Sequence, residues 1–216
     1  MVNLAVKPEH RAKLLELRKA VHDWMLEIRD VGLLPECDFL ARAKAMGDAP
    51  YNVGHSSSLP LERILDTADK ASMREAKDTP ELVKRLTDAD AAVRFWAVLG
   101  LQMRGSEVAK ANAAALRQML KDPMPAPRLA AAETIARFGS DADAKLGIEV
   151  CLSDADAVKS GSATTILALN ALTAFGVKAK PFFDRIKALV VKDPKSPQRL
   201  QEYPARLYET LMRDLA

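Results

Sequence analysis

Apolar residues recur at helical spacing along almost the whole chain, and in its middle this pattern repeats itself. One unit contains Leu86-Thr87-Asp88, Val93-Arg94, Ala97, Leu101 and Gly105. The next contains the matching residues Leu120-Lys121-Asp122, Arg128, Ala131, Ile135 and Gly139, so that Asp122 follows Asp88 by 34 positions. Such a period, with a polar turn and a glycine stop in each unit, is typical of antiparallel helix pairs stacked in a row. The sequence therefore predicts an all-α fold, a helical solenoid.

A third unit is less regular. Its turn, residues 152–154, follows the second turn by 32 positions, but its second helix, around Ala168 and Leu172, lies 37 positions after its counterpart. Five extra residues, around 158–162, therefore separate the two helices, and Thr165 stands where the earlier units have arginine. Inserted segments in solenoids map to one face, often the face that meets partners. A longer turn without such a role is the favoured interpretation here, since loops tolerate added length well.

The first helix is marked by a stripe of apolar residues. Pro8 suits the first position of a helix. The stripe then follows at spacings of three and four residues: Leu14, Leu17, Val21, Trp24 and Ile28. These spacings place the side chains on one face of a long amphipathic helix, which we expect to pack on another surface. Trp24, like Trp96 in the repeat region, lies within an apolar stripe, which favours burial in a core over exposure as a partner contact.

Turn-forming residues divide the chain. Residues 32–35, Gly-Leu-Leu-Pro, end the first helix, and a short helix is expected over 37–46. Residues 47–59 contain two glycines, a proline and three consecutive serines, as is typical of a loop. Further helices are expected to start at Pro60, at Thr79-Pro80 and after Asp90, and the last two to cover 181–191 and 201–215. We therefore distinguish an N-terminal helical segment (1–46), a linker (47–59) and the solenoid (60–216).

The composition suits a helical protein with a sizeable core. Of 216 residues, 49% are hydrophobic and 28% are charged, and glycine is scarce. The formal net charge is +3, with a basic excess only in residues 177–216, which hold nine basic and five acidic side chains. A nucleic-acid surface normally needs a denser stripe of Lys and Arg, so nucleic-acid binding ranks low. The sequence shows no apolar run of about 18 residues and no basic-apolar-small start, so neither a membrane span nor a signal peptide is expected.

The residue types that carry catalysis or bind metals are scattered. Cys37 and Cys151 belong to no Cys/His cluster, which favours small packing residues over zinc ligands and leaves a disulfide open. His10 and His22 lie 12 positions apart, not at the i, i+4 spacing that shares a metal. His55 precedes three serines, but adjacent residues rarely reach the geometry of a nucleophile and its base. A polar loop is the better interpretation there, and no catalytic, cofactor-binding or metal-binding residue is predicted.

The repeat resembles the HEAT family, whose units combine an aspartate in the turn with a Val-Arg pair at the start of the second helix. Asp88 with Val93-Arg94 fits this pattern, Asp122 with Arg128 fits as well, and Asp154 lacks a matching arginine. The resemblance implies that the two arginines are scaffold residues. We expect them to satisfy helix-end carbonyls or neighbouring aspartates.

Short motifs in the first third of the chain resemble the C-terminal region of some bacterial sulfatases. They are Asn3-Leu4-Ala5, Trp24-Met25, Gly32-Leu33-Leu34-Pro35-Glu36, Pro50-Tyr51, Pro60-Leu61-Glu62, Ile64-Leu65 and Ala68-Asp69-Lys70-Ala71-Ser72. In those proteins the first motif resembles the end of the catalytic domain, and a HEAT-like extension follows it. Their catalysis uses a cysteine or serine in a C/S-x-P-x-R motif, with acidic residues around a calcium ion. Neither Cys37 nor Cys151 stands in such a motif, so the resemblance implies a non-catalytic tail.

The leading hypothesis is a non-catalytic binding or scaffolding module, the HEAT-like C-terminal extension of a sulfatase-type hydrolase. Its expected partner is the catalytic domain, which this sequence lacks, or another protein, with self-association through the first-helix face as a further expectation. The alternative is a stand-alone HEAT-repeat adaptor that binds a protein. An enzyme on HEAT repeats, such as an alkylpurine DNA glycosylase or a bilin lyase, ranks last because it would need a basic, aromatic-lined groove. The compartment is left open; a tail of an exported sulfatase would be periplasmic or extracellular.

Overall fold

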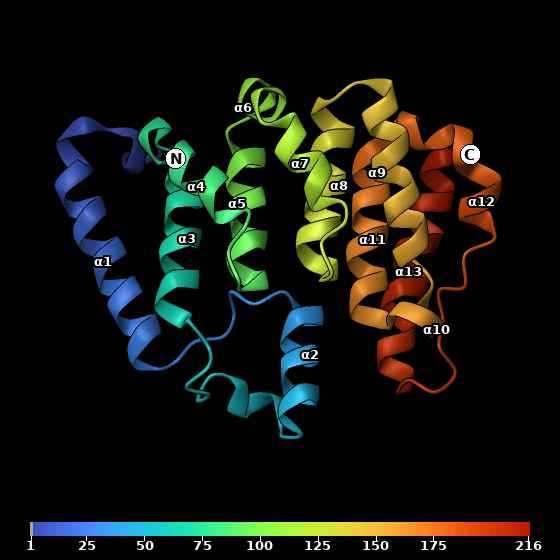
Figure 1. Ribbon diagram of the computed structural model, residues 1–216, viewed down its shortest axis with the longest axis horizontal. Helices are drawn as coiled ribbons and strands as arrows, with labels where there is room; N and C mark the ends of the chain where they lie inside the picture. Colours follow the sequence, from blue (N-terminus) through green and yellow to red (C-terminus); the bar gives the residue numbers. More distant parts are fainter. Residues whose placement is uncertain (1) are drawn as a thin grey trace.

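The computed structural model describes residues 2–216, and within that range the chain forms helices and no β-strand (Figure 1). The longer helices are α1 (Arg11–Glu27), α2 (Glu36–Met46), α3 (Leu61–Met73), α5 (Ala91–Met103), α8 (Pro125–Phe138), α9 (Asp141–Asp154), α11 (Ser162–Phe175) and α13 (Gln198–Leu215). The shorter ones are α4 (Thr79–Arg85), α6 (Ser106–Ala111), α7 (Ala113–Met119), α10 (Ala157–Ser160) and α12 (Phe183–Lys187). Turns of 3-10 helix cover Leu4–Val6, Pro8–His10, Pro50–Val53, Ala76–Asp78 and Gly176–Phe182.

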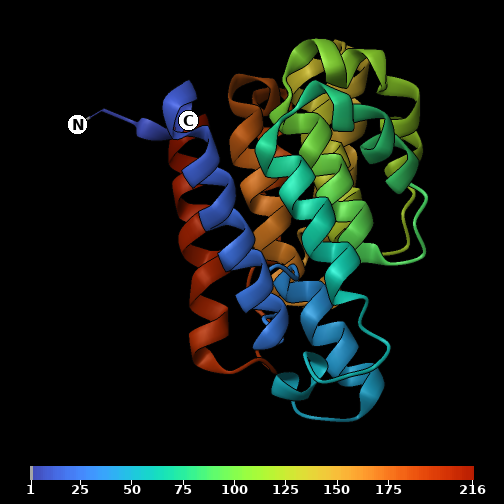
Figure 2. The ribbon, with the colours of Figure 1, turned by 90° about the vertical axis from the view of Figure 1, so that its left-hand side faces the viewer.

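The helices stack in a row, as the repeat predicts. Helices α3, α5, α8, α11 and α13 each pack on the next, while α4, α7 and α9 pair with them from a second layer (Figure 1). Figure 1 places α1 and α13 at opposite ends of the row, and Figure 2 shows that both lie on the same side of it. Helix α2 lies at one edge of the row, against α8 and α11. The predicted all-α solenoid is confirmed.

Small residues allow the helices of the row to approach closely. Ala97, Ala131 and Ala168 are fully buried, as the sequence predicts for close helix contacts. At Gly100 an added Cβ would lie 2.7 Å from Leu82 Cδ1, so α4 and α5 have no room for a larger side chain there. The apolar residues around these positions form a nearly continuous core along the stack.

Capping residues start the repeat helices where the sequence indicates. The Asp90 carboxylate accepts hydrogen bonds from the backbone N–H groups of Ala92 and Val93 at the start of α5. Ser140 and Asp143 form a reciprocal capping box at the start of α9. The five-residue insertion of the third unit becomes the short helix α10 and Gly161, directly before α11.

The C-terminal helices differ from the prediction. Of residues 181–191, only Phe183–Lys187 form an α-helix, because the preceding Gly176–Phe182 segment winds as a 3-10 helix that starts at a glycine with φ +53°. The last helix begins at Gln198 rather than at 201, directly after Pro197, and has Pro204 in its interior. Pro197 lies at the N-cap, where a proline breaks no intrahelical hydrogen bond.

One stretch, Ser162–Lys187, is long and apolar enough to cross a membrane by length and composition alone, and no other such helix occurs in residues 2–216. Its first part is α11, which packs against α8, α9 and α13. Ala168, Leu169 and Leu172 of this helix are fully buried. These contacts are those of a core helix of the solenoid.

Candidate functional site

Arginines and aspartates of successive repeats form a ladder. Arg94 donates from Nε and Nη2 to the two carboxylate oxygens of Asp122, at 2.6 and 2.8 Å. Arg128 binds Asp154 in the same way, with both distances 2.9 Å. Each arginine also donates to a backbone carbonyl of its own turn, that of Asp88 or of Asp122. The expected scaffold role of Arg94 and Arg128 is confirmed.

A further rung of this ladder was not predicted. Arg63 of α3 lies 3.2 Å from the carboxylate of Asp88, so an ion pair links α3 to the turn before α5. The signal in the sequence is the spacing: Arg63 precedes Asp88 by 25 positions, close to the 26 that separate Arg128 from Asp154. The pKa of Arg94 is raised by its hydrogen bonds to Asp122, so this guanidinium stays charged and paired. The charged residues of the repeat motif are therefore engaged within the scaffold.

Helix α1 presents the first surface that the scaffold leaves uncovered. None of its residues is buried, and four members of the predicted stripe are about half exposed: Leu17 (57%), Val21 (54%), Trp24 (57%) and Ile28 (47%). The prediction that Trp24 lies in a core is therefore wrong. The reason is that α1 turns a different side, with His22, Met25 and Leu26, toward the solenoid, where these residues are half-buried. Trp96 is half-buried and donates its indole N–H to the carbonyl of Leu33, at 2.9 Å.

Polar contacts hold α1 in place although its apolar stripe is exposed. His22 Nδ1 lies 2.6 Å from a carboxylate oxygen of Asp69 on α3, and Arg11 forms an ion pair with Glu75. At the other end, Arg29 donates to the carbonyls of Gly54 and Ser56, at 2.6 and 3.1 Å. The stripe is thus presented on a fixed helix. Its Leu17 and Val21 also line a groove of about 260 Å³ between α1 and α3.

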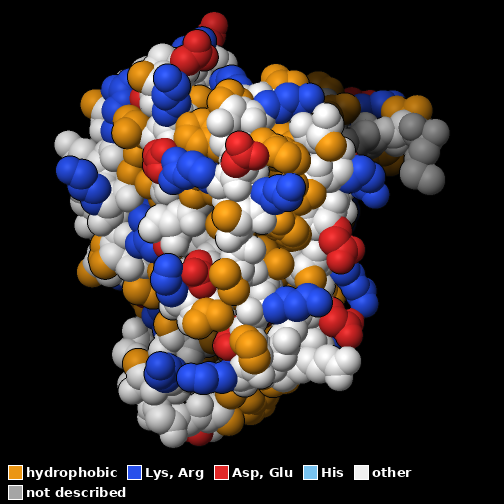
Figure 3. All heavy atoms as spheres, turned by 90° about the vertical axis from the view of Figure 1, so that its right-hand side faces the viewer, with side chains coloured by type: hydrophobic (Ala, Val, Ile, Leu, Met, Phe, Trp, Pro, Cys, Tyr) orange, Lys and Arg blue, Asp and Glu red, His pale blue; other side chains and the backbone are white. Residues whose placement is uncertain are grey.

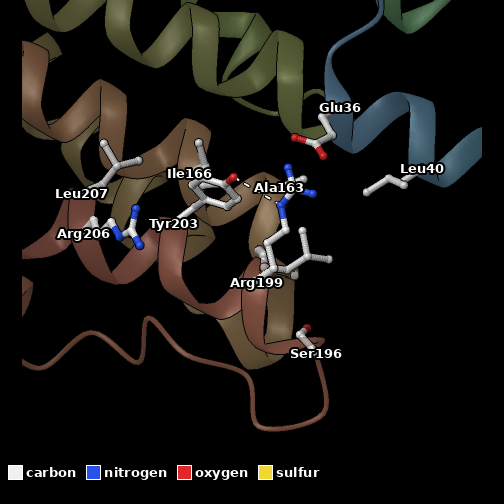
Figure 4. Close-up of a pocket in the computed structure, with 12 residues that line it drawn as sticks. Glu36, Leu40, Ala163, Ile166, Ser196, Arg199, Tyr203, Arg206 and Leu207 are labelled. Atoms are coloured by element: carbon white, nitrogen blue, oxygen red, sulfur yellow. Dashed lines mark hydrogen bonds between the residues drawn. The ribbon is translucent and has the colours of Figure 1, made fainter.

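A cleft at the other end of the row is the second surface. It has a volume of about 830 Å³ and lies between α2, the start of α11 and one face of α13. The apolar side chains that line the cleft are Leu40 of α2, Ala163 and Ile166 of α11, and Leu200 and Leu207 of α13. Its polar groups are Glu36, Ser162, Ser196, Arg199, Tyr203 and Arg206. Figure 4 shows the Arg199 side chain extending toward Glu36 on the opposite wall, with the Tyr203 hydroxyl beside it.

The outer face at this end of the row carries a mixed surface. Figure 3 shows hydrophobic side chains interspersed with Lys and Arg and with fewer acidic groups. Terminal repeats of a solenoid need such polar groups on their outer side because no further repeat covers them. The apolar side chains that gather in the cleft are therefore the more distinctive feature of this end.

The histidines and serines that were considered as catalytic or metal-binding residues do not form a common site. His22 lies in the contact between α1 and α3, and the His55 ring lies 5.0 Å from that of Tyr51. The hydroxyls of Ser56 and Ser58 bond to each other, at 2.8 Å. Among residues 2–216, no three His, Cys, Asp or Glu side chains come together in a group that could hold a metal ion.

Both cysteines are free thiols, and each is at least partly buried by the rest of the chain. Cys151 is fully buried in the core, in agreement with the predicted packing role, and burial raises the pKa of its thiol. Cys37 is half-buried on α2; burial and the neighbouring Asp38 carboxylate raise the pKa of its thiol to about 11. Neither site favours the thiolate that nucleophilic chemistry requires.

Comparison with known protein families finds a match within the repeat region. A profile of the family described as HEAT repeats matches residues 79–168, from the start of α4 into α11. This range contains the rungs Arg94–Asp122 and Arg128–Asp154. No curated protein and no solved structure matches the chain. The match supports the predicted HEAT-like solenoid, and the comparisons give no support for a link with sulfatases.

Proposed function

We propose that this chain is a non-catalytic interaction module, a HEAT-like scaffold that binds a partner protein through the exposed stripe of α1. HEAT repeats commonly mediate protein interactions, which favours this class of function. The observation that carries the proposal is the half-exposed state of Leu17, Val21 and Trp24, on a helix that buries none of its residues, and of Ile28 at its C-cap. A contiguous apolar patch of this kind marks an interaction site.

Energetic considerations favour Trp24 as the centre of the contact. A fully covered tryptophan buries roughly 150–250 Å², and a partner on the stripe would cover the 57% of Trp24 that is exposed in the free chain. Val21 and Ile28 lie one turn to either side of Trp24 on the same face, where they exclude water from it. Because polar contacts already fix α1, little conformational entropy is lost when the stripe is covered.

The partner that we propose is the catalytic domain of a sulfatase-type hydrolase. This finer proposal is supported by the short sequence motifs between Asn3 and Ser72, and by the stripe, which needs a cover that residues 2–216 do not supply. The proposal uses the division of the chain that the sequence predicts: an N-terminal segment (1–46), a linker (47–59) and a solenoid (60–216). In this arrangement segment 1–46 joins the catalytic domain to the solenoid. The alternative is an adaptor whose α1 stripe binds an unrelated protein.

A reconstitution experiment tests the proposed docking. The chain is mixed with a sulfatase-type catalytic domain that is encoded in the same genome and carries the C/S-x-P-x-R motif, and complex formation is followed by sedimentation velocity. We expect a stable complex for the unaltered chain. Val21→Asp and Trp24→Asp are expected to abolish it, because each places a charge in the apolar contact.

The matched control for these variants is Val177→Asp. Val177 is 76% exposed and lies beyond the end of α11, far from α1 in the sequence, so this substitution makes the same chemical change away from the stripe. A complex that Val177→Asp weakens as much as Val21→Asp, or the absence of any complex, would rule out the sulfatase partner. Hydrolysis of an aryl sulfate by the purified chain, with calcium present, would overturn the non-catalytic assignment.

A further inference from the structure

Helix α11, like α8 before it, starts without a side-chain cap. At the starts of α5 and α9, Asp90 and Ser140 accept hydrogen bonds from backbone N–H groups. The N-cap of α11 is Gly161, in the left-handed region with φ +78°, and it has no side chain to offer. Gly161, Ser162 and Ala163 line the cleft. The first backbone N–H groups of this 14-residue helix, which form the positive end of its dipole, therefore lie at the cleft.

A buried hydroxyl at the same point lacks a partner. Ser162 lines the cleft and is 9% exposed, and its Oγ has no hydrogen-bond partner. Buried polar groups are normally satisfied, so the Ser162 hydroxyl retains the capacity to bond to a group that enters the cleft. Ser162 ends the five-residue insertion of the third repeat, around 158–162.

Two arginines of α13 add positive charge to this cleft. Arg199 donates to the Tyr203 hydroxyl at 3.4 Å, and within residues 2–216 no carboxylate lies within ion-pair distance of its guanidinium. Arg206 is paired with Glu202, at 2.8 Å, on the exposed side of the same helix. The one acidic side chain among the lining residues is Glu36, across the cleft on α2. The cationic groups and the helix end together attract an anionic group.

The same face of α13 is apolar between the arginines. Leu200, Tyr203 and Leu207 recur at helical spacing and line the cleft opposite Leu40 and Ile166. A small inorganic anion would leave these side chains uncovered. A helix whose own apolar face is edged by an acidic residue would cover them and also supply the missing acceptor, which is the helix-in-groove mode of recognition.

We propose that this cleft is a second binding site, which takes an amphipathic helix of a partner protein with an acidic side chain beside its apolar face. The apolar face lies on Leu200, Leu207 and Ile166. The Asp or Glu carboxylate caps α11 from outside, near Ser162 and within reach of Arg199. This site is independent of the protein that covers α1, and it makes the chain a scaffold that bridges two partners.

Designed peptides test the proposal with the full-length chain. The probe is a fluorescently labelled, helix-stapled peptide of about 14 residues, or four turns, with Leu at i, i+3, i+4 and i+7 and one Glu beside them. Two control peptides, called the Gln twin and the Lys twin, have the same sequence except for Gln or Lys in place of that Glu. Fluorescence anisotropy is expected to show that the Glu peptide binds about tenfold more tightly than the Gln twin, and the Lys twin less tightly still.

Variants of the cleft assign the contact to its residues. Arg199→Met and Ser162→Ala are expected to remove the preference for Glu over Gln, and Leu207→Glu to abolish binding of every peptide. Glu36→Gln is expected to strengthen binding of the Glu peptide because it removes the carboxylate that repels it. Arg213→Met is the matched control: Arg213 is also on α13 and 75% exposed, but it lies outside the cleft, so binding should not change.

Equal binding of the three peptides, no binding of any, or the same loss for Arg213→Met as for Arg199→Met would overturn the proposal. Circular dichroism of each variant verifies its fold. Val21→Asp on α1 is expected to leave peptide binding unchanged, and Arg199→Met to leave the α1-dependent complex unchanged. Failure of one site is thereby distinguished from failure of the other.

Discussion

Arg94 and Asp122 join two successive repeats through a pair of parallel hydrogen bonds, at 2.6 and 2.8 Å, that is almost completely removed from solvent. The side chain of Arg94 is 12% exposed and that of Asp122 is 3% exposed. The same carboxylate also accepts the backbone N–H of Met124, at the start of α8. Asp122 thus links the turn of its own repeat to the preceding helix. Arg128 and Asp154 repeat this two-bond arrangement, whereas Arg63, whose side chain is 48% exposed, makes a single contact of 3.2 Å with Asp88.

Truncating the Arg94 side chain is expected to destabilise the whole solenoid. Arg94→Ala leaves the Asp122 carboxylate buried without its partner, and breaking a buried pair in this way costs about 3–5 kcal/mol. Urea unfolding followed by circular dichroism measures the loss. Arg185→Ala is the matched control, because Arg185 binds Glu149 with a similar fork but both side chains are about half exposed. Exposed pairs contribute little, so the control should change stability far less. Equal losses for the two variants would contradict the ladder as a source of stability.

Asp143 is expected to make stability depend on pH in the acid range. Arg117 donates two hydrogen bonds to its carboxylate, at 2.5 and 2.9 Å, and the Ser140 backbone N–H and hydroxyl donate two more. These donors lower the pKa of Asp143 well below its ordinary value of about 3.9. The unfolded chain therefore binds this proton more readily, and the contribution of Asp143 is present above about pH 5 and is lost as the pH falls toward the folded pKa.

The comparison with Asp143→Asn isolates this contribution. The variant cannot titrate, so the difference in unfolding free energy between it and the unaltered chain should be largest near neutral pH and should shrink between about pH 5 and about pH 2. Urea denaturation at a series of pH values provides the measurement. A difference that stays constant over this range would show that the carboxylate does not carry the charge-assisted bonds described above.

The two cysteines are expected to react slowly and in a fixed order. The pKa of Cys37 is raised to about 11 by burial and by Asp38, and Cys151 is fully buried. Because the thiolate is the reactive form, iodoacetamide should modify Cys37 slowly at pH 8 and faster as the pH rises, and should reach Cys151 only after unfolding. Mass spectrometry of the tryptic peptides measures both rates. Rapid modification of Cys37 at neutral pH would contradict the raised pKa.

The repeat region could be predicted from the sequence because its signals are local. Asp90 as a cap, the small residues at Ala97 and Ala131, and the Asp/Arg motif each depend on neighbours within one repeat or the next. The degenerate rung Arg63–Asp88 was missed because α3 lacks the Val-Arg pair that marks the motif.

The two candidate surfaces depend on long-range packing, which the pattern does not contain. The stripe of α1 is as apolar as a core-facing stripe, so the pattern alone does not tell which side of the helix meets the solenoid, where His22 and Arg29 make polar contacts. The cleft brings together α2, α11 and α13, and Glu36 and Arg199 are 163 positions apart in the chain. The sequence shows the insertion around 158–162 that ends at Ser162, but it does not show that this segment lines a cleft.

The central claim is that the α1 stripe is a prepared contact surface, and the fluorescence of Trp24 tests it most directly. In a Trp96→Phe variant, Trp24 is the remaining tryptophan, and its 57% exposure predicts red-shifted emission that iodide quenches in the free chain. Addition of the sulfatase-type catalytic domain should shift the emission to the blue and protect it from iodide. A Trp24 that is already blue-shifted and protected in the free, monomeric chain would contradict the account.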